Sequence, residues 1–181
     1  MRFVLLSGLY PLIFLIALTF SFASYSANSH FENAKTSFHA ENYDETIIHL
    51  KNALRDKPED IPSRLLLAET LLAQGKGEVA ETELLDLQDD GVDFNQLITY
   101  FAQAYFLQDK HDLLLEKITP GYRGKNTEAE ILYYRGQAYL ALNQLHSADN
   151  EFLIALEIDP AHQPTKIARA QLAIQQGQLS K

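Results

Sequence analysis

The side chains best suited to chemistry in this chain are its six histidines. Imidazole can bind a metal ion or exchange protons near neutral pH. No histidine lies four residues from another, and there is no HExxH motif, so the spacing that places two ligands on one helical face is missing. We therefore interpret the histidines as solvated surface residues. They are His30, His39, His49, His111, His146 and His162.

The segment Asp89–Asp93 resembles a calcium loop in its composition, but it lacks the full twelve-residue pattern that ends in glutamate. The chain has no GxSxG elbow, no glycine loop for phosphate and no GxGxxG fingerprint. It has no cysteine, which excludes disulfides, thiolate metal sites and cysteine nucleophiles. The sequence therefore predicts a protein that is not an enzyme and that uses no cofactor and no metal.

The charge balance is acidic, which limits the classes of partner. The chain has 15 Lys and Arg against 24 Asp and Glu, a formal net charge of −9. Binding to nucleic acid needs clustered Lys and Arg, and no such cluster occurs. Hydrophobic residues make up 46% of the chain, as is usual for a folded domain. We expect a folded protein with no nucleic-acid partner.

Residues 1–27 have the layout of a targeting segment. Arg2 precedes an apolar run over residues 3–23, and small residues follow it. This order is typical of a secretory signal peptide, but about 20 apolar residues also suffice for a membrane anchor. A buried helix is the third alternative, and it fits poorly because the run has no polar face. We expect an exported protein in which residues 1–27 are a signal peptide or an N-terminal membrane anchor, with residues 3–23 as the membrane tether in the second case.

The rest of the chain repeats with a period of 34 residues. A helical unit that recurs in register is the sequence signature of a solenoid. Small residues that allow two helices to approach closely form the series Ala34, Ala68, Ala102, Gly136 and Ala170. Larger residues in the second half of each unit form the series Leu50, Leu84, Ile118 and Phe152.

The last complete unit shows the pattern most clearly. Gly136 and Ala148 are small where the two helices of a hairpin cross, and Tyr139 and Phe152 are large where they fill the space between hairpins. Pro160 stops the second helix, because proline lacks an N–H donor and clashes with the preceding turn.

This spacing resembles the consensus of the tetratricopeptide repeat (TPR). The resemblance implies an all-α TPR solenoid of antiparallel helix hairpins, coiled as a right-handed superhelix, over residues 28–181. The expected repeats are approximately 27–60, 61–94, 95–128 and 129–162, with a half repeat at 163–181. The expected helices are 29–40 with 43–56, 61–74 with 77–88, 94–107 with 111–118, 128–141 with 145–157, and a lone helix at 163–176.

Three units depart from the pattern. The first unit has Ser37 and Thr46 where bulky and small apolar residues are usual, which suits a solvent-facing end. The second helix of the third unit runs early into Pro120 and Gly121, and an irregular linker follows. This linker is either a bend or binding loop, or simply a degenerate repeat with a short helix. The fifth unit stops after its first helix, which either caps the stack or belongs to a longer array. Lys166 and Arg169 fit a cap, because a cap is polar on its outer face.

The TPR resemblance implies a concave groove lined by the first helix of each hairpin. A polar series recurs there every 34 residues, and an apolar stripe lies three positions further on. Such a surface suits an extended peptide or an amphipathic helix, because amides pair with its backbone while the stripe takes its side chains. The apolar residues can equally pack between adjacent helices. The predicted partner-binding residues are Lys35, Phe38, Glu69, Leu72, Gln103, Phe106, Tyr133, Gln137 and Gln171, with Leu140 and Ile174 as further members of the stripe.

The stretches at 47–54, 64–72 and 80–93 are similar to the N-terminal repeats of one bacterial group. These are the TPR lipoproteins that accompany exosortase/PEP-CTERM sorting and exopolysaccharide systems in Gram-negative bacteria. The present chain departs from them because it is far shorter and has no cysteine to carry a lipid. The similarity implies a periplasmic protein, or one anchored in the inner membrane and facing the periplasm.

These observations predict a non-catalytic protein–protein interaction scaffold of the bacterial cell envelope. The resemblance links it to exopolysaccharide export or PEP-CTERM protein sorting, with a protein or peptide as partner. The alternative is that the chain is the truncated N-terminal portion of a larger TPR array with no binding activity of its own.

Overall fold

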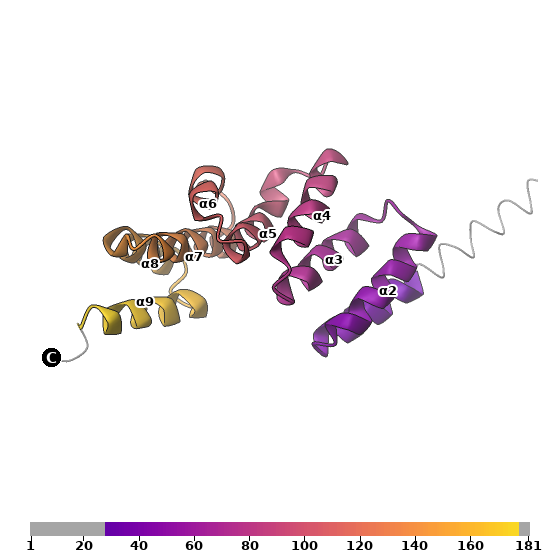
Figure 1. Cartoon of the computed structure of the whole chain (residues 1–181), viewed down its shortest axis with the longest axis horizontal. Coiled ribbons are helices and arrows are strands. Elements are labelled where there is room, and N and C mark those ends of the chain that lie inside the picture. Colours follow the sequence, from indigo (N-terminus) through magenta and orange to yellow (C-terminus); the bar gives the residue numbers. More distant parts are fainter. Residues whose placement is uncertain (1–27, 178–181) are drawn as a thin grey trace, which may run out of the picture. The chain divides into compact units, whose positions relative to one another are not determined.

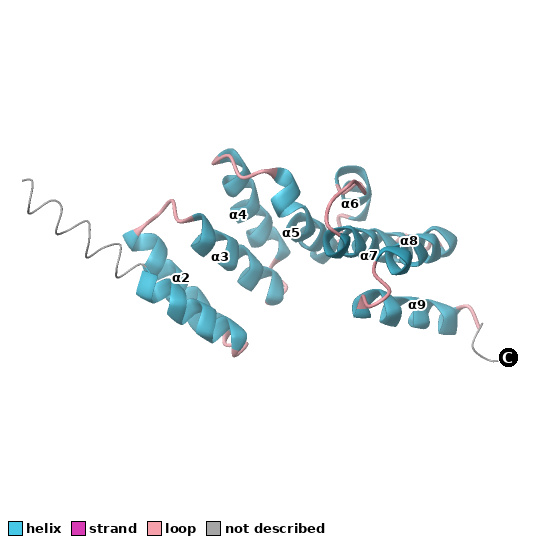
Figure 2. Ribbon diagram, turned by 180° about the vertical axis from the view of Figure 1, so that it is seen from behind, coloured by secondary structure: helices cyan, strands magenta, loops and turns pink. Residues whose placement is uncertain are grey.

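The computed structural model describes residues 28–177, and every regular element in that range is a helix (Figure 2). The chain divides into two compact units, Met1–Thr70 and Leu71–Lys181, with the boundary inside α3. A helix over residues 28–39 comes first. The helices labelled in Figure 1 follow as α2 (Tyr43–Asp56), α3 (Ile61–Ala73), α4 (Gly77–Asp89), α5 (Phe94–Leu107), α6 (His111–Lys117), α7 (Lys125–Ala141), α8 (Leu145–Ile158) and α9 (Gln163–Gln175).

These helices confirm the predicted all-α fold and its period. The largest difference from the expected bounds is at α7, which begins at Lys125 rather than at residue 128. The first helices of the hairpins are residues 28–39, α3, α5 and α7, and α9 takes the same place in the fifth repeat. The second helices are α2, α4, α6 and α8. The expectation that Ser37 and Thr46 suit a solvent-facing end is wrong, because both side chains are buried and the Thr46 hydroxyl donates to the Asn42 carbonyl.

The turn after each first helix has the same backbone conformation in every repeat. A residue with positive φ stands at positions 41, 75, 109 and 143, and again at Gly177 after α9. The next residue donates its N–H back across the helix end, as from Gln144 to the carbonyl of Tyr139 at 2.8 Å. This is the hydrogen bond of a Schellman-type helix end. Two of the five positive-φ residues are glycines, and Asp109 and Asn143 are of types enriched in this conformation, so only Glu41 is unusual there.

In the second unit, α7 and α8 pack closely because a glycine faces an aromatic ring. A Cβ atom added to Gly136 would lie 2.6 Å from Cδ1 and 2.9 Å from Cζ of Phe152. The Phe152 side chain is fully buried. Ala168 and Leu172 of α9 belong to the same apolar cluster as Phe152 and Ala148.

The third repeat loses its second helix early, as expected, and α7 compensates for the loss. The helix α6 has seven residues, and its last carbonyls have no continuing helix to bond to. Arg135 of α7 donates from Nη1 to the carbonyls of Leu115 and Ile118, at 3.0 and 2.9 Å. Its guanidinium also contacts the Glu151 carboxylate of α8 at 3.0 Å.

One buried carboxylate organises the linker between α6 and α7. The Glu128 carboxylate accepts hydrogen bonds from the backbone N–H groups of Gly121 and Arg123, at 2.9 and 3.2 Å. The Arg123 guanidinium reaches the same carboxylate at 3.1 Å, and its Nη1 also donates to the carbonyl of Thr119. The irregular segment predicted here is therefore fixed by specific hydrogen bonds.

The predictions made for residues 1–27 lie outside the described residues. Among the helices of residues 28–177, none combines the length and the apolar character needed to span a bilayer.

Candidate functional site

Three of the predicted groove residues lie in the first unit. Lys35 pairs with Glu32 at 3.0 Å and lies over the ring of Phe31. The ring of Phe38 lies 5.8 Å from that of Tyr43. Burial raises the pKa of the Glu69 carboxyl above its usual range, although the nearby His39 acts in the opposite direction. This half-buried carboxyl therefore loses its proton less readily than the carboxyl of a surface glutamate.

In the second unit, the predicted glutamines lie on three first helices that are neighbours, since α7 contacts both α5 and α9. Gln103 and Gln137 are partly exposed, and Gln171 is exposed. Gln137 donates from Nε2 to the hydroxyl of Tyr133 at 3.2 Å, which leaves its amide oxygen available to accept. We call Gln103, Gln137 and Gln171 the glutamine ladder.

Apolar residues flank the glutamine ladder on both sides along α7 and α9, and on one side along α5. Residues four positions before and three positions after a given residue share its helical face. The expected row after the ladder is Phe106, Leu140 and Ile174, and Ile174 is 64% exposed. A second row, before the ladder, is Thr99, Tyr133 and Ile167, and Ile167 is 58% exposed.

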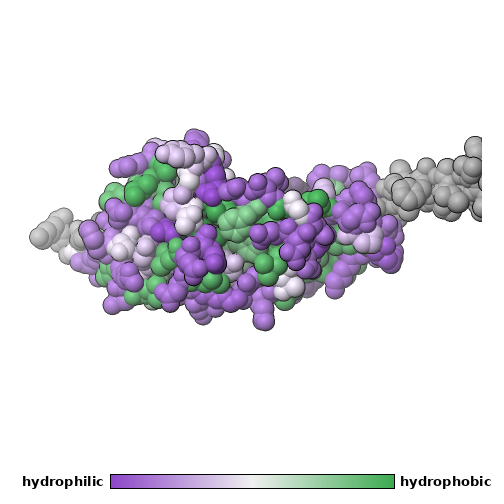
Figure 3. Space-filling view, turned by 90° about the horizontal axis from the view of Figure 1, so that it is seen from above, coloured by the Kyte–Doolittle hydropathy of each residue, from purple (hydrophilic) through white to green (hydrophobic). Residues whose placement is uncertain are grey.

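Sequence reasoning identified only Tyr133 of this second row. The same 34-residue spacing that revealed the ladder would have revealed Ile167 as well, although the polar Thr99 interrupts the apolar pattern on α5. Polar side chains dominate the face shown in Figure 3, and apolar residues gather there in small groups. Two exposed isoleucines on one face of α9 therefore call for a reason.

Leu72 has a different environment from the other predicted groove residues. Its side chain is 2% exposed, so it belongs to the packed interior. For Leu72 the structure therefore favours the packing alternative over a contact with a partner. Phe106, at the corresponding place on α5, is partly exposed.

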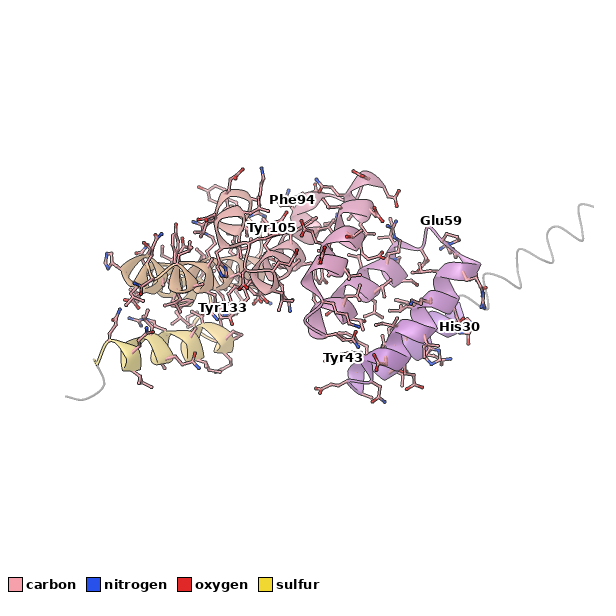
Figure 4. All side chains as sticks on the ribbon, in the orientation of Figure 1. His30, Tyr43, Glu59, Phe94, Tyr105 and Tyr133 are labelled. Atoms are coloured by element: carbon pink, nitrogen blue, oxygen red, sulfur yellow. The ribbon has the colours of Figure 1, made fainter. Side chains whose placement is uncertain are left out.

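Aromatic rings from α5 and α7 form one cluster beside the ladder. The ring of Tyr134 lies 6.0 Å from Phe106 and 5.1 Å from Tyr133, and Tyr133 lies 6.5 Å from the buried Phe152. Figure 4 labels Tyr133 in the space between α7 and α9. Each ring thus has at least one aromatic neighbour, which stabilises the cluster.

His162 joins the start of α9 to α7, and it corrects our interpretation of the histidines. Its Nε2 lies 2.8 Å from a Glu130 carboxylate oxygen, and its Nδ1 lies 2.7 Å from the Thr165 hydroxyl. Its side chain is 11% exposed, and that of His111 is 13% exposed. The prediction that all six histidines are solvated is therefore wrong for these two. The reason is that each packs against an aromatic ring, of Tyr133 and Phe106 respectively.

The buried tyrosines of this cluster are expected to make the stability of the fold decrease with pH in the alkaline range. Burial raises the pKa of the Tyr134 hydroxyl well above its usual range, and the charge of Glu130 adds to the effect. Burial also raises the pKa of Tyr133. A pKa that is higher in the folded state stabilises the fold below the unfolded value, and the contribution is lost as pH rises above it. We expect the urea midpoint to fall as pH rises above about 10, and to fall less in Tyr134→Phe.

The matched control is Tyr122→Phe, because Tyr122 is fully exposed. This variant should follow the wild-type curve between pH 8 and pH 11. An equal response from both variants would show that burial of Tyr134 is not the cause.

Comparison with known proteins agrees with the helical-repeat fold described above. Residues 37–99 match the family model described as tetratricopeptide repeat. A search of curated proteins found no match. The solved structure from a functional characterization of Pseudomonas aeruginosa pilF is similar, with a TM-score of 0.66 at 12% identity over 86% of this chain and 71% of that one. The NMR structure of the first TPR domain of human RPAP3 aligns at a TM-score of 0.33, with 17% identity over 82% of this chain and 91% of that one.

These matches establish an all-α helical-repeat fold of the TPR type. They do not bear on the similarity to PEP-CTERM-associated lipoproteins. TPR domains generally bind protein or peptide partners.

Proposed function

We propose that the chain is a non-catalytic interaction scaffold that holds an extended peptide segment across α5, α7 and α9. The observation that carries the proposal is the glutamine ladder on three neighbouring helices, with an apolar row after it and a largely apolar row before it. Glutamine amides both donate and accept, so they suit the peptide groups of an extended chain. The flanking rows take its side chains.

The spacing of the helices supports an extended segment. Packed helices lie about 8–10 Å apart, and an extended chain advances about 3.3 Å per residue. A bound peptide would therefore meet one glutamine at about every third residue. The exposed ends of the flanking rows, Ile167 and Ile174, lie on α9 and would contact one end of the peptide.

The test uses a library of random peptides displayed on phage and selected against the full chain. We expect selected peptides to lose affinity roughly 30-fold when Gln103→Ala is combined with Gln137→Ala, because two hydrogen bonds of about 1 kcal/mol each are removed. The affinities are measured by fluorescence anisotropy with synthetic copies of the peptides.

The control pair is Leu153→Ala with Ile154→Ala, which alters two partly exposed apolar residues of α8. Binding should be unchanged in this control. Peptides that bind the glutamine variant at wild-type strength, or that lose affinity only in the α8 variant, would refute the ladder as the site.

We also propose that this scaffold acts in the bacterial cell envelope, exported through residues 1–27 and linked to exopolysaccharide export or PEP-CTERM sorting. The support is the apolar run over residues 3–23 and the sequence similarity of the first repeats. An alkaline phosphatase fused after residue 181 should be active in a Gram-negative host, and an inactive fusion would contradict export.

A further inference from the structure

The second unit has a cleft between α8 and α9 that lies outside the ladder. Its volume is about 330 Å³. Among the described helices, only α7 and α8 contact α9, which Figures 1 and 2 show at the end of the series. The lining includes Asp149 and Leu156 of α8 and Lys166, Arg169, Ala170 and Ala173 of α9.

The repeat itself shows what covers this face on a first helix. Ala170 and Arg169 stand 34 residues after Gly136 and Arg135 of α7. On α7 that face is covered by α8, whose Phe152 packs on Gly136 and whose Glu151 pairs with Arg135. The corresponding face of α9 carries the same arrangement of a small residue beside an arginine.

The sizes of the paired residues follow a rule within the chain. Ala34, Ala68 and Ala102 correspond to Leu50, Leu84 and Ile118, sixteen positions later, and all six are buried. Only the smaller Gly136 corresponds to a phenylalanine. A helix that covers Ala170 is therefore expected to place leucine or isoleucine there.

The charged residues of the cleft indicate which charge the polar face of such a helix should carry. Lys166 and Arg169 are two cations in a chain whose net charge is −9. Arg169 pairs with Asp149 at 2.9 Å and is still 41% exposed on its side chain. A helix with acidic residues next to its apolar stripe would complement this pair of cations.

We propose that the cleft between α8 and α9 binds an acidic amphipathic helix of a partner protein, in the way that α8 binds α7. A leucine or isoleucine of the partner lies on Ala170, and a carboxylate one position before it pairs with Arg169. Leu156 and Ala173 provide further apolar contacts. This site is distinct from the ladder, so the two can be occupied independently.

The probe is a fluorescein-labelled peptide with the sequence of residues 144–159, because α8 is the helix that covers this face on α7. One form keeps the phenylalanine that corresponds to Phe152, and another replaces it by leucine. We expect the leucine form to bind the full wild-type chain at least fivefold more tightly than the phenylalanine form. Ala170→Gly should reverse this preference, because it recreates the space present at Gly136.

Ala170→Phe fills the cleft and should weaken both peptides at least tenfold. Ala170 is exposed, so the variant should fold, which circular dichroism checks. Exchanging the peptide's glutamate that corresponds to Glu151 for lysine should also weaken binding. The variant Gln103→Ala with Gln137→Ala should bind both peptides normally, which separates this proposal from that of the ladder.

Three results would overturn the proposal. The first is no binding of either peptide, which would make α9 a solvated cap. The second is undiminished binding to Ala170→Phe, which would mean that the peptide displaces α8 from α7. The third is a dimer of the full chain, seen by sedimentation and abolished by Ala170→Phe, which would assign the cleft to a second copy.

Discussion

Replacing Arg135 by alanine is expected to lower the free energy of unfolding by about 3–5 kcal/mol. The side chains of Arg135 and Glu151 are each 12% exposed, and Nε and Nη2 of the arginine lie 3.1 and 3.0 Å from one Glu151 oxygen. The substitution would leave that carboxylate buried without its partner, which costs more than the intact pair contributes.

The same substitution removes the partner of the last carbonyls of α6. The helix ends after Lys117, so the Leu115 and Ile118 carbonyls depend on the Arg135 guanidinium. Each lost hydrogen bond to a buried acceptor costs about 1–3 kcal/mol, and this cost is part of the total loss expected for Arg135→Ala. We therefore expect the loss to be seen first as faster hydrogen exchange in α6.

The matched control is Arg169→Ala, which alters the equivalent position of the next repeat. Arg169 and Asp149 are 41% and 36% exposed on their side chains, so this pair should contribute less than about 1 kcal/mol. Urea unfolding followed by circular dichroism compares the two variants. Equal losses would show that burial of the Arg135 pair does not matter.

A second variant separates the ion pair from the helix end. Arg135→Met combined with Glu151→Met replaces both charges by apolar side chains of similar length, which is often nearly neutral for a buried pair. The double variant should regain part of the stability lost in Arg135→Ala, and the α6 carbonyls should account for the remainder. No recovery would locate the whole effect at the end of α6.

The repeat period made most of the fold predictable from the sequence. It located each hairpin turn, including those in which Glu41, Asp109 or Asn143 has positive φ. It could not reveal the hydrogen bonds of Glu128 and Arg123, because these occur once, in the repeat that departs from the pattern. Periodicity shows only what the repeats have in common, so it cannot predict hydrogen bonds that occur in a single irregular repeat.

The candidate site was predictable only in part, for a related reason. The register placed Gln103, Gln137 and Gln171 on neighbouring helices, because equivalent positions of stacked repeats share a face. Burial at those positions depends on what each neighbouring helix covers. That is why Leu72 is enclosed while Ile174 is exposed, although both stand at the same place in the repeat.

The second large effect is expected at Gly136, where alanine should destabilise the protein by about 1–3 kcal/mol. Helix propensity alone favours alanine over glycine by about 1 kcal/mol. Overpacking should outweigh that gain, because the added Cβ would lie 2.6 Å from Cδ1 of Phe152. The ring is fully buried and also contacts Tyr133, so it has little room to shift.

The pairs of the other repeats suggest how to rescue this variant. Ala34 and Ala102 are both buried, and the residues sixteen positions later are Leu50 and Ile118. Phe152→Leu by itself should destabilise, since it leaves a cavity beside Gly136. Combined with Gly136→Ala, it recreates the pair found in the first repeat.

A double-mutant cycle decides between a specific fit and a general loss of packing. We expect the double variant to be more stable than the sum of the two single losses predicts, by about 1 kcal/mol or more. Additive losses would mean that the glycine and the phenylalanine do not depend on each other. In that case the size rule would fail on α7, and the expectation of leucine or isoleucine on Ala170 would lose its basis as well.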